Sequence, residues 1–131
     1  MNQQFIQYIR DNLNEFGDLK WHMISRDQIL SESFIREFQD KVYWPYISYE
    51  QILSKPFIRE YQDKVEWKQI SQYQTLSEPF IREYQDEVDW LYISIFQILS
   101  ESFIREFKNK VNWIAISNNS KYVYTNRETN L

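Results

Sequence analysis

The sequence has no cysteine, a single glycine and a single histidine, and each shortage excludes a kind of chemistry. Without cysteine there are no disulfides, no thiolate nucleophiles and no cysteine-ligated zinc sites. Gly17 alone cannot build the glycine-rich loop that cradles phosphate groups. His22, the one histidine, takes a position that holds other residues elsewhere in the chain, so we expect it on the surface. We therefore predict a non-enzymatic protein with no catalytic residues, no metal ligands and no cofactor.

Long apolar runs and clustered basic residues are also lacking. No stretch reaches the roughly 18 apolar residues that suggest a membrane-spanning helix, and the opening segment 1–4 lacks the charged and then apolar pattern of a signal peptide. The 15 basic and 19 acidic residues are mixed along the chain, whereas a nucleic-acid-binding surface needs Lys and Arg gathered together. We expect a cytoplasmic, intracellular protein that binds neither nucleic acid nor membrane.

The chain is dominated by one segment, F-I-R-E-F-Q-D-K-V, which begins at Phe34 and returns almost unchanged at Phe57, Phe80 and Phe103. The spacing is 23 residues each time. A longer unit surrounds it, I-S-x-x-Q-x-L-S-x-x-F-I-R-E-[F/Y]-[Q/K]-[D/N]-x-V-x-W. Most of the chain is therefore one short module copied four times, which is the pattern of a repeat protein.

The repeated segment predicts a helix over 34–42 and over the equivalent ranges, which we call the Phe-led helices. Phe34, Ile35, Phe38 and Val42 lie at i, i+1, i+4 and i+8, a single apolar stripe with the helical period. A serine stands three residues before each of these helices, where its hydroxyl is placed to act as N-cap. These serines are Ser31, Ser54, Ser77 and Ser100. Pro56 and Pro79 fall in the first turn, where no helical hydrogen bond is lost.

Charged residues line the exposed side of the Phe-led helices. Arg36 with Asp40 and Glu37 with Lys41 fall at i,i+4, which predicts ion pairs within one helix. The recurring arginines predict stacked salt bridges rather than an anion-binding ladder; they are Arg36, Arg59, Arg82 and Arg105. The densest acidic cluster is interpreted as a solvated face, with a cation-binding or basic-partner patch as the alternative; it consists of Glu83, Asp86, Glu87 and Asp89.

A second helix is predicted in each copy, running from a tryptophan to a leucine, and we call these the Trp-led helices. Their expected ranges are 21–30, 44–53, 67–76 and 90–99. Trp44, Ile47, Ser48 and Gln51 lie at i, i+3, i+4 and i+7, so two polar residues share the buried face. A small serine lets neighbouring helices approach closely, and the glutamine is suited to satisfying a buried backbone group at a turn. Pro45 again falls in a first turn.

The two ends of the chain depart from the repeat. Phe5, Ile6, Ile9 and Leu13 predict a capping helix over 2–14, and Gly17 is expected to end that helix in the left-handed conformation. Leu19 and Trp21 are expected in the positions of Val42 and Trp44. The repeat pattern ends after Ser117, with Ser120 where a glutamine is expected and Tyr122 where a leucine is expected. The segment 122–124 is predicted to fold back over the last repeat.

These patterns together predict an all-α fold, an α-solenoid of four 23-residue two-helix repeats with an N-terminal capping helix and an irregular C-terminal cap. Neither helix can bury its stripe within one copy, so the copies must stack. We expect one repeat domain over 1–131, divided into an N-terminal cap (1–18), the repeats (19–117) and a C-terminal cap with tail (118–131). Most of the aromatic side chains, including the tryptophans at 21, 44, 67 and 90, are predicted to lie in the core.

The motif L-S-[E/K]-[S/P]-F-I-R-E-[F/Y]-Q-D-K-V-x-W-x-x-I-S resembles the short tandem repeats of uncharacterised proteins from giant DNA viruses and phage-like elements. The resemblance covers roughly residues 19–117. It implies a viral origin, a repeat scaffold and, for a viral protein, the host cell cytoplasm as its location.

The partner surface is predicted where the copies disagree, one, five and eight residues after each tryptophan. In the fourth copy these positions hold Leu91, Ile95 and Ile98, which are all apolar, whereas the third copy is polar there. The residues that we predict to contact a partner are Tyr49, Tyr73, Leu91, Tyr92, Ile95 and Phe96. Contiguous exposed apolar area usually marks an interface, although the alternative is that Tyr122 and Tyr124 cover this patch.

Three functions remain open. The first is a protein-binding repeat scaffold that acts by occupying a partner protein's surface, for example that of a host protein in a host-virus interaction. The second is a viral or phage inhibitor of a host defence protein, similar in action to anti-CRISPR proteins. The third is a structural repeat protein that self-associates.

Overall fold

Helices are the only regular structure in residues 1–119, the part of the chain that this computed structural model describes. The chain divides into two compact units, Met1–Glu66 and Trp67–Leu131, and each is described by itself. Within both units Trp-led and Phe-led helices alternate along the sequence and lie at regular spacing, which confirms the predicted all-α repeat fold. The segment 120–131, with the predicted fold-back of 122–124, lies outside the described residues.

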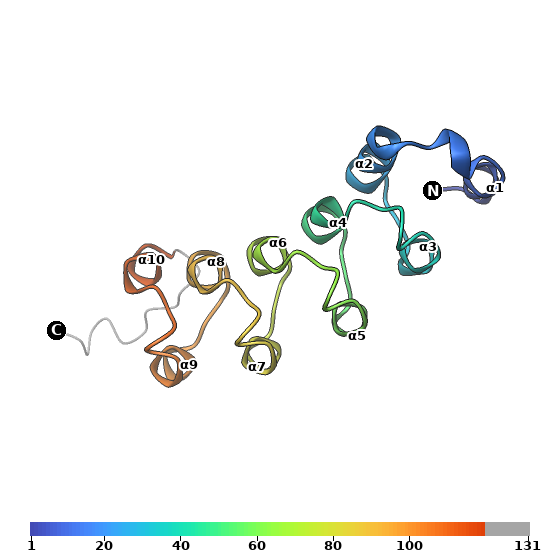
Figure 1. The fold of residues 1–131 in the computed structure, drawn as a ribbon. Helices are drawn as coiled ribbons and strands as arrows, with labels where there is room; N and C mark the ends of the chain where they lie inside the picture. The colour runs from blue at the N-terminus through green and yellow to red at the C-terminus, as the bar shows by residue number, and fades with distance from the viewer. Residues whose placement is uncertain (120–131) are drawn as a thin grey trace. The chain divides into compact units, whose positions relative to one another are not determined.

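In the first unit, α2 and α4 are the Trp-led helices and lie side by side, while α3 and α5 are the Phe-led helices and form a second layer (Figure 1). The N-terminal helix α1 packs next to α3, since Arg10 of α1 pairs with Glu37 of α3. The bounds are α1 Gln3–Asp11, the 3-10 helix η1 Leu13–Glu15, α2 Asp18–Asp27, α3 Glu32–Glu37, α4 Trp44–Glu50 and α5 Lys55–Glu60.

In the second unit, three Trp-led helices, α6, α8 and α10, follow one another in one layer, with α8 packed against both of the others. The Phe-led helices α7 and α9 form the other layer. The bounds are α6 Trp67–Tyr73, α7 Glu78–Glu83, α8 Trp90–Phe96, α9 Glu101–Glu106 and α10 Trp113–Asn118.

The predicted serine caps and first-turn prolines are confirmed, although α2 begins at Asp18, before the predicted start at Trp21. The hydroxyl of Ser31 accepts a hydrogen bond of 3.0 Å from the backbone N–H of Phe34, and the other three serines repeat this contact at their own helices. Pro45, Pro56 and Pro79 all lie in a first turn. Each serine cap is expected to contribute about 1 kcal/mol to helix stability.

The Phe-led helices are shorter than predicted. The helix over 34–42 ends at Glu37, because Phe38 takes φ −107° and ψ 29° and leaves the helical region. The N–H groups of Lys41 and Val42 both bond to the carbonyl oxygen of Phe38, which closes a turn. The apolar stripe nevertheless stays buried, from Phe34 to Val42, because the turn keeps Val42 on the same side.

The Trp-led helices also end earlier than predicted, at Glu50 in α4 and at Phe96 in α8. The next residue is a glutamine in an extended conformation, with φ −87° and ψ 146° at Gln51. This backbone change directs the glutamine side chain into the preceding repeat, as described below. The residues eight positions after each tryptophan therefore lie in turns, so Ile98 was wrongly predicted to lie on the helix.

The core of each repeat is a set of three aromatic rings. Trp44 lies 5.3 Å from Tyr61 and 6.3 Å from Phe57, measured between ring centroids. Trp90 makes the equivalent contacts with Phe103 and Phe107. The indole N–H of Trp44 also donates to the carbonyl oxygen of Gln39, which fixes the turn after α3. The predicted core role is confirmed for Trp21 and for the Phe and Tyr rings of the Phe-led segments, which are buried, whereas the tryptophans at 44, 67 and 90 are only half-buried beside them. Large buried side chains of this kind stabilise short helices.

Two predictions at the N-terminal end are wrong. Gly17 has φ −82° and is the N-cap of α2, so it neither ends α1 nor adopts the left-handed conformation. The chain instead leaves α1 through the 3-10 helix η1. Leu19 lies in the first turn of α2 and is 73% exposed, so it does not take the buried position of Val42.

Most ion pairs of the Phe-led layer join consecutive repeats, although Arg105 pairs with Glu101 at 2.8 Å within α9. Arg36 pairs with Glu60 at 3.0 Å instead of with Asp40, and Asp40 pairs with Lys64. Arg82 likewise pairs with Glu106 at 2.8 Å. The stacked salt bridges predicted for the arginines are thus present at these positions. The i,i+4 partners predicted for Arg36 and Glu37 are wrong, because Arg36 pairs with Glu60 of the next Phe-led helix and Glu37 pairs with Arg10 of α1.

Candidate partner-binding surface

Buried glutamines hold the Trp-led layer together. In the first unit the Nε2 group of Gln51 donates to the carbonyl oxygens of Ser25 and Gln28, at 3.0 and 2.7 Å. Its Oε1 accepts from the N–H of Leu30 at 3.0 Å. One side chain thus satisfies three backbone groups where the preceding Trp-led helix ends, which is where helix ends leave such groups without partners. The predicted role of the glutamine is confirmed, and we call this arrangement a glutamine bridge.

The second unit contains the same bridge. Gln97 donates to the carbonyl oxygens of Ser71 and Gln74, both at 2.8 Å, and accepts from the N–H of Leu76 at 3.0 Å. The last copy lacks the glutamine, but Asn119 replaces it from one position earlier. Its Nδ2 group donates to the carbonyl oxygens of Ser94 and Gln97. The sequence analysis missed this substitute because it tested only position 120 for an amide.

Buried serines make a second set of contacts between repeats. Ser71 is fully buried, and its hydroxyl accepts from the N–H of Asp89, the N-cap of α8, at 2.9 Å. Ser48 and Ser94 bond in the same way to Glu66 and Asn112. Serine is therefore present because it is both small and an acceptor, which confirms its predicted place at the tight contact between Trp-led helices.

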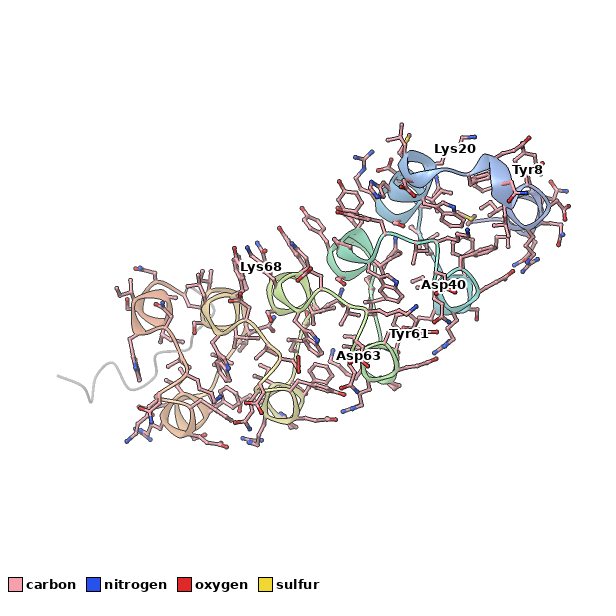
Figure 2. The ribbon with its side chains drawn as sticks, viewed as in Figure 1. Tyr8, Lys20, Asp40, Tyr61, Asp63 and Lys68 are labelled. Atoms are coloured by element: carbon pink, nitrogen blue, oxygen red, sulfur yellow. The ribbon has the colours of Figure 1, made fainter. Side chains whose placement is uncertain are left out.

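The glutamine and serine hydrogen bonds use one face of each Trp-led helix, so the opposite face is the one exposed to solvent. In the second unit this face is almost without charge, since Lys68 is the only charged residue in α6, α8 and α10. Figure 2 shows Lys68 on the outer side of this layer. The Phe-led helices differ, because α7 and α9 each carry three charged residues. The two layers of the unit therefore present chemically different surfaces.

The predicted partner residues of the second unit lie on this uncharged face. Tyr92 and Phe96 stack on one side of α8, with ring centroids 6.0 Å apart. Phe96 and Tyr73 line one shallow pocket between the ends of α6 and α8. Leu91 is 45% exposed and lines a groove together with Ile95. These five residues form the outer surface, a name that we use below for Tyr73, Leu91, Tyr92, Ile95 and Phe96.

Tyr49, the sixth predicted residue, belongs to the first unit. It is exposed on α4. The outer side of the Trp-led layer there is more polar, because α2 contributes Arg26, whose guanidinium lies 5.8 Å from the ring centre of Tyr46. Pairing with Asp27 raises the pKa of Arg26 further above its already high ordinary value. The apolar surface is thus best developed in the second unit.

A groove between α8 and α10 adjoins the outer surface. Its volume is about 450 Å³, and it is lined by Leu91, Ile95, Asn112, Ile114, Ala115 and Asn118. Ile114 is 77% exposed at its edge. The sequence analysis missed Ile114 and Ala115, although a signal was available. Ala115 is small where the other Trp-led helices have Met23, Tyr46, Gln69 and Tyr92.

His22 and members of the acidic cluster make contacts within the fold. His22 is half-buried rather than on the surface, and its ring lies 3.8 Å from that of Tyr43. Asp89 caps α8, and Asp86 pairs with Lys110. Across residues 1–119 no three acidic, histidine or cysteine side chains gather as metal ligands. In the same range, no helix combines the length and the apolar character that crossing a bilayer requires.

The chain matches no protein-family model, no curated protein and no solved structure.

Proposed function

We propose that this chain is a non-enzymatic scaffold that binds a partner protein through the outer surface of its second unit. The observation that supports this most directly is the absence of charge on α8 and α10, where apolar and aromatic side chains lie in solvent. Charged residues are depleted and aromatic residues enriched at the centre of protein interfaces. Burying this face against a partner therefore requires little desolvation of charge.

The fold supports the proposal because the outer surface is not needed to hold the repeats together. Ser71, Ser94 and Gln97 make the contacts between repeats from the opposite face of the same helices. Leu91 can therefore remain exposed at no cost to these contacts. A solvent-exposed leucine, tyrosine and isoleucine on neighbouring helices is an arrangement that folding alone does not require.

The resemblance of the repeat to those of giant DNA viruses supports a host protein as the partner, which the chain would act on by occupying its surface. Lys68 is the only positive charge on the Trp-led helices of the second unit, which favours a protein partner over nucleic acid.

Leu91→Glu tests the proposal. Because Leu91 is already exposed, the glutamate should leave the melting temperature within a few degrees of wild type while placing a charge at the centre of the surface. Lysate capture with wild type, L91E and the control Ser102→Glu on α9 should recover a discrete protein with wild type and S102E only. Equal recovery by all three would contradict the proposal. Sedimentation of the purified chain separates a foreign partner from self-association.

A further inference from the structure

The groove between α8 and α10 differs from the grooves between α2 and α4 and between α6 and α8, because no aromatic side chain of residues 1–119 lines it. Two consecutive Trp-led helices meet along a line. On the first helix this line holds the residues one and five positions after its tryptophan, and they face the residue two positions after the tryptophan of the second helix. Between α2 and α4 this line is filled by Tyr46, which lies against His22 and Arg26. Between α6 and α8 it is filled by Tyr92, which lies under Lys68 at 5.4 Å.

Between α8 and α10 the corresponding residue is Ala115, and the space that a tyrosine ring takes elsewhere is part of the groove of about 450 Å³. A volume of this size falls within the roughly 300 to 1,000 Å³ of ordinary ligand pockets. The walls have changed along with the missing ring. Leu91 and Ile95 stand where α2 has His22 and Arg26 and where α6 has Lys68 and Gln72.

The charge of the walls indicates what the groove accepts. In the two filled grooves a cationic side chain faces the tyrosine ring, and the quadrupole of the ring attracts the cation. None of the described residues that line the open groove carries a charge, so a charged side chain entering it would lose solvation without gaining a partner among them. An uncharged aromatic side chain suits these walls, because it gains from apolar burial alone. Asn112 and Asn118 add carboxamide groups to the lining, which suit the peptide groups that flank such a side chain.

We propose that this groove binds an uncharged aromatic side chain, such as tryptophan or phenylalanine, presented by a segment of the partner protein. The inference rests on the proposed function and specifies its anchor point. The partner's ring takes the place that Tyr46 and Tyr92 take in the other grooves, and Leu91, Ile95 and Ile114 surround it. Aromatic anchors in apolar pockets typically contribute the largest share of binding energy in protein interfaces.

The test uses the full chain, methyl-labelled for NMR, and N-acetyl-tryptophanamide as the probe. We expect saturable shifts confined to the methyl groups of Leu91, Ile95, Ile114 and Ala115, and no such shifts with N-acetyl-lysinamide. Ala115→Tyr restores the tyrosine of the other grooves and should weaken probe binding by about tenfold or more while retaining the wild-type helical content. If A115Y fails to fold, Ile95→Gln, which copies Gln72 of α6, serves as the second variant and should also weaken binding.

Shifts that do not saturate, or that are equal in wild type and both variants, would overturn the inference. It is also overturned if the free protein shows contacts between residues 120–131 and the methyls of Leu91 and Ile95, because the occupant is then the chain's own segment. Shifts of these methyls that grow with protein concentration would identify a second copy instead. None of these results affects the Leu91→Glu capture experiment. A failed groove test, together with capture that still depends on Leu91, leaves partner binding at the outer surface without an aromatic anchor in the groove.

Discussion

The side-chain amide nitrogen of Gln97 lies 2.8 Å from the carbonyl oxygen of Ser71, a residue 26 positions earlier in the chain. This contact joins the turn after α8 to the body of α6, and both groups are buried. Because the same amide also bonds to Gln74 and Leu76, one side chain satisfies backbone groups that a seven-residue helix leaves open at its end. Helices this short are only marginally stable alone, and the glutamine bridge supplies hydrogen-bond partners for the backbone groups at their ends.

Replacing Gln97 with alanine should lower the free energy of unfolding by on the order of 3 kcal/mol, because buried backbone groups lose their hydrogen bonds. Gln85→Ala is the matched control, since Gln85 is only half-buried and bonds to the carbonyl oxygen of Arg82. Urea denaturation measures both. Equal losses in the two variants would show that the bridge adds no more than an exposed amide does.

Ser71 should tolerate neither alanine nor leucine. Ser71→Ala removes the acceptor for the N–H of Asp89 and should cost about 1 kcal/mol. Ser71→Leu should cost a further 1 to 3 kcal/mol or so, because added methyl groups overpack the contact between α6 and α8. Ser102→Ala, at an exposed position, is the control. Thermal unfolding that ranks S71L above S71A would contradict a tight contact at this position.

The ion pair between Arg82 and Glu106 should make stability depend on pH in acid. The hydrogen bond that Arg82 donates lowers the pKa of Glu106 below its ordinary value of 4.5. A depressed pKa in the folded state means that the stabilisation is present above about pH 4.5 and is lost as the pH falls through the folded pKa.

The effect is measured from the melting temperatures of wild type and Glu106→Gln across roughly pH 2 to 7, the range in which carboxylates titrate. The difference in melting temperature should be present near neutrality and disappear in acid, and it should shrink in high salt. Glu87→Gln removes the same charge from an exposed turn outside the described ion pairs and should show no such difference. A constant difference at every pH would exclude the ion pair as its cause.

Gly17→Ser should stabilise the first unit by roughly a few tenths of a kcal/mol, because a serine supplies the N-cap acceptor that α2 lacks, although glycine is itself a tolerated N-cap. The backbone of Gly17 is close to that of Ser31, and an added Cβ meets no atom within 4 Å. Asn14→Ser is a control for the substitution outside a helix cap. A lower melting temperature for G17S would point instead to the left-handed conformation that the sequence pattern predicted.

The repeat and its buried residues were predictable because they follow local rules. Ser31 precedes an apolar stripe by three residues, and Gln51 shares a face with Trp44, so N-capping and burial could be inferred from spacing. The helix lengths could not. Whether α4 continues past Glu50 depends on a competition between one more helical turn and the bridge that Gln51 makes to the preceding repeat.

Several errors arise because contacts between repeats override those within one helix. Arg36 has Asp40 at i,i+4 and Glu60 one repeat away, and spacing alone does not show which lies nearer. In the candidate site, the aromatic and aliphatic members of the outer surface were predicted from disagreement among the copies. Ala115 was missed because its importance depends on the space that it leaves open. That space is recognised only when the structure shows a tyrosine ring at the equivalent position of the other grooves.

The glutamine bridges also bear on how such a chain diversifies. Gln97 and Ser94 hold α8 in place from one face, whereas Leu91 and Ile95 lie on the other. Substitutions at the outer positions are therefore expected to change the exposed surface while the hydrogen bonds that hold the helix stay in place. If that surface binds a partner as proposed, its specificity can change through a few sites per copy, and duplication of a copy adds further outer positions to the same stack.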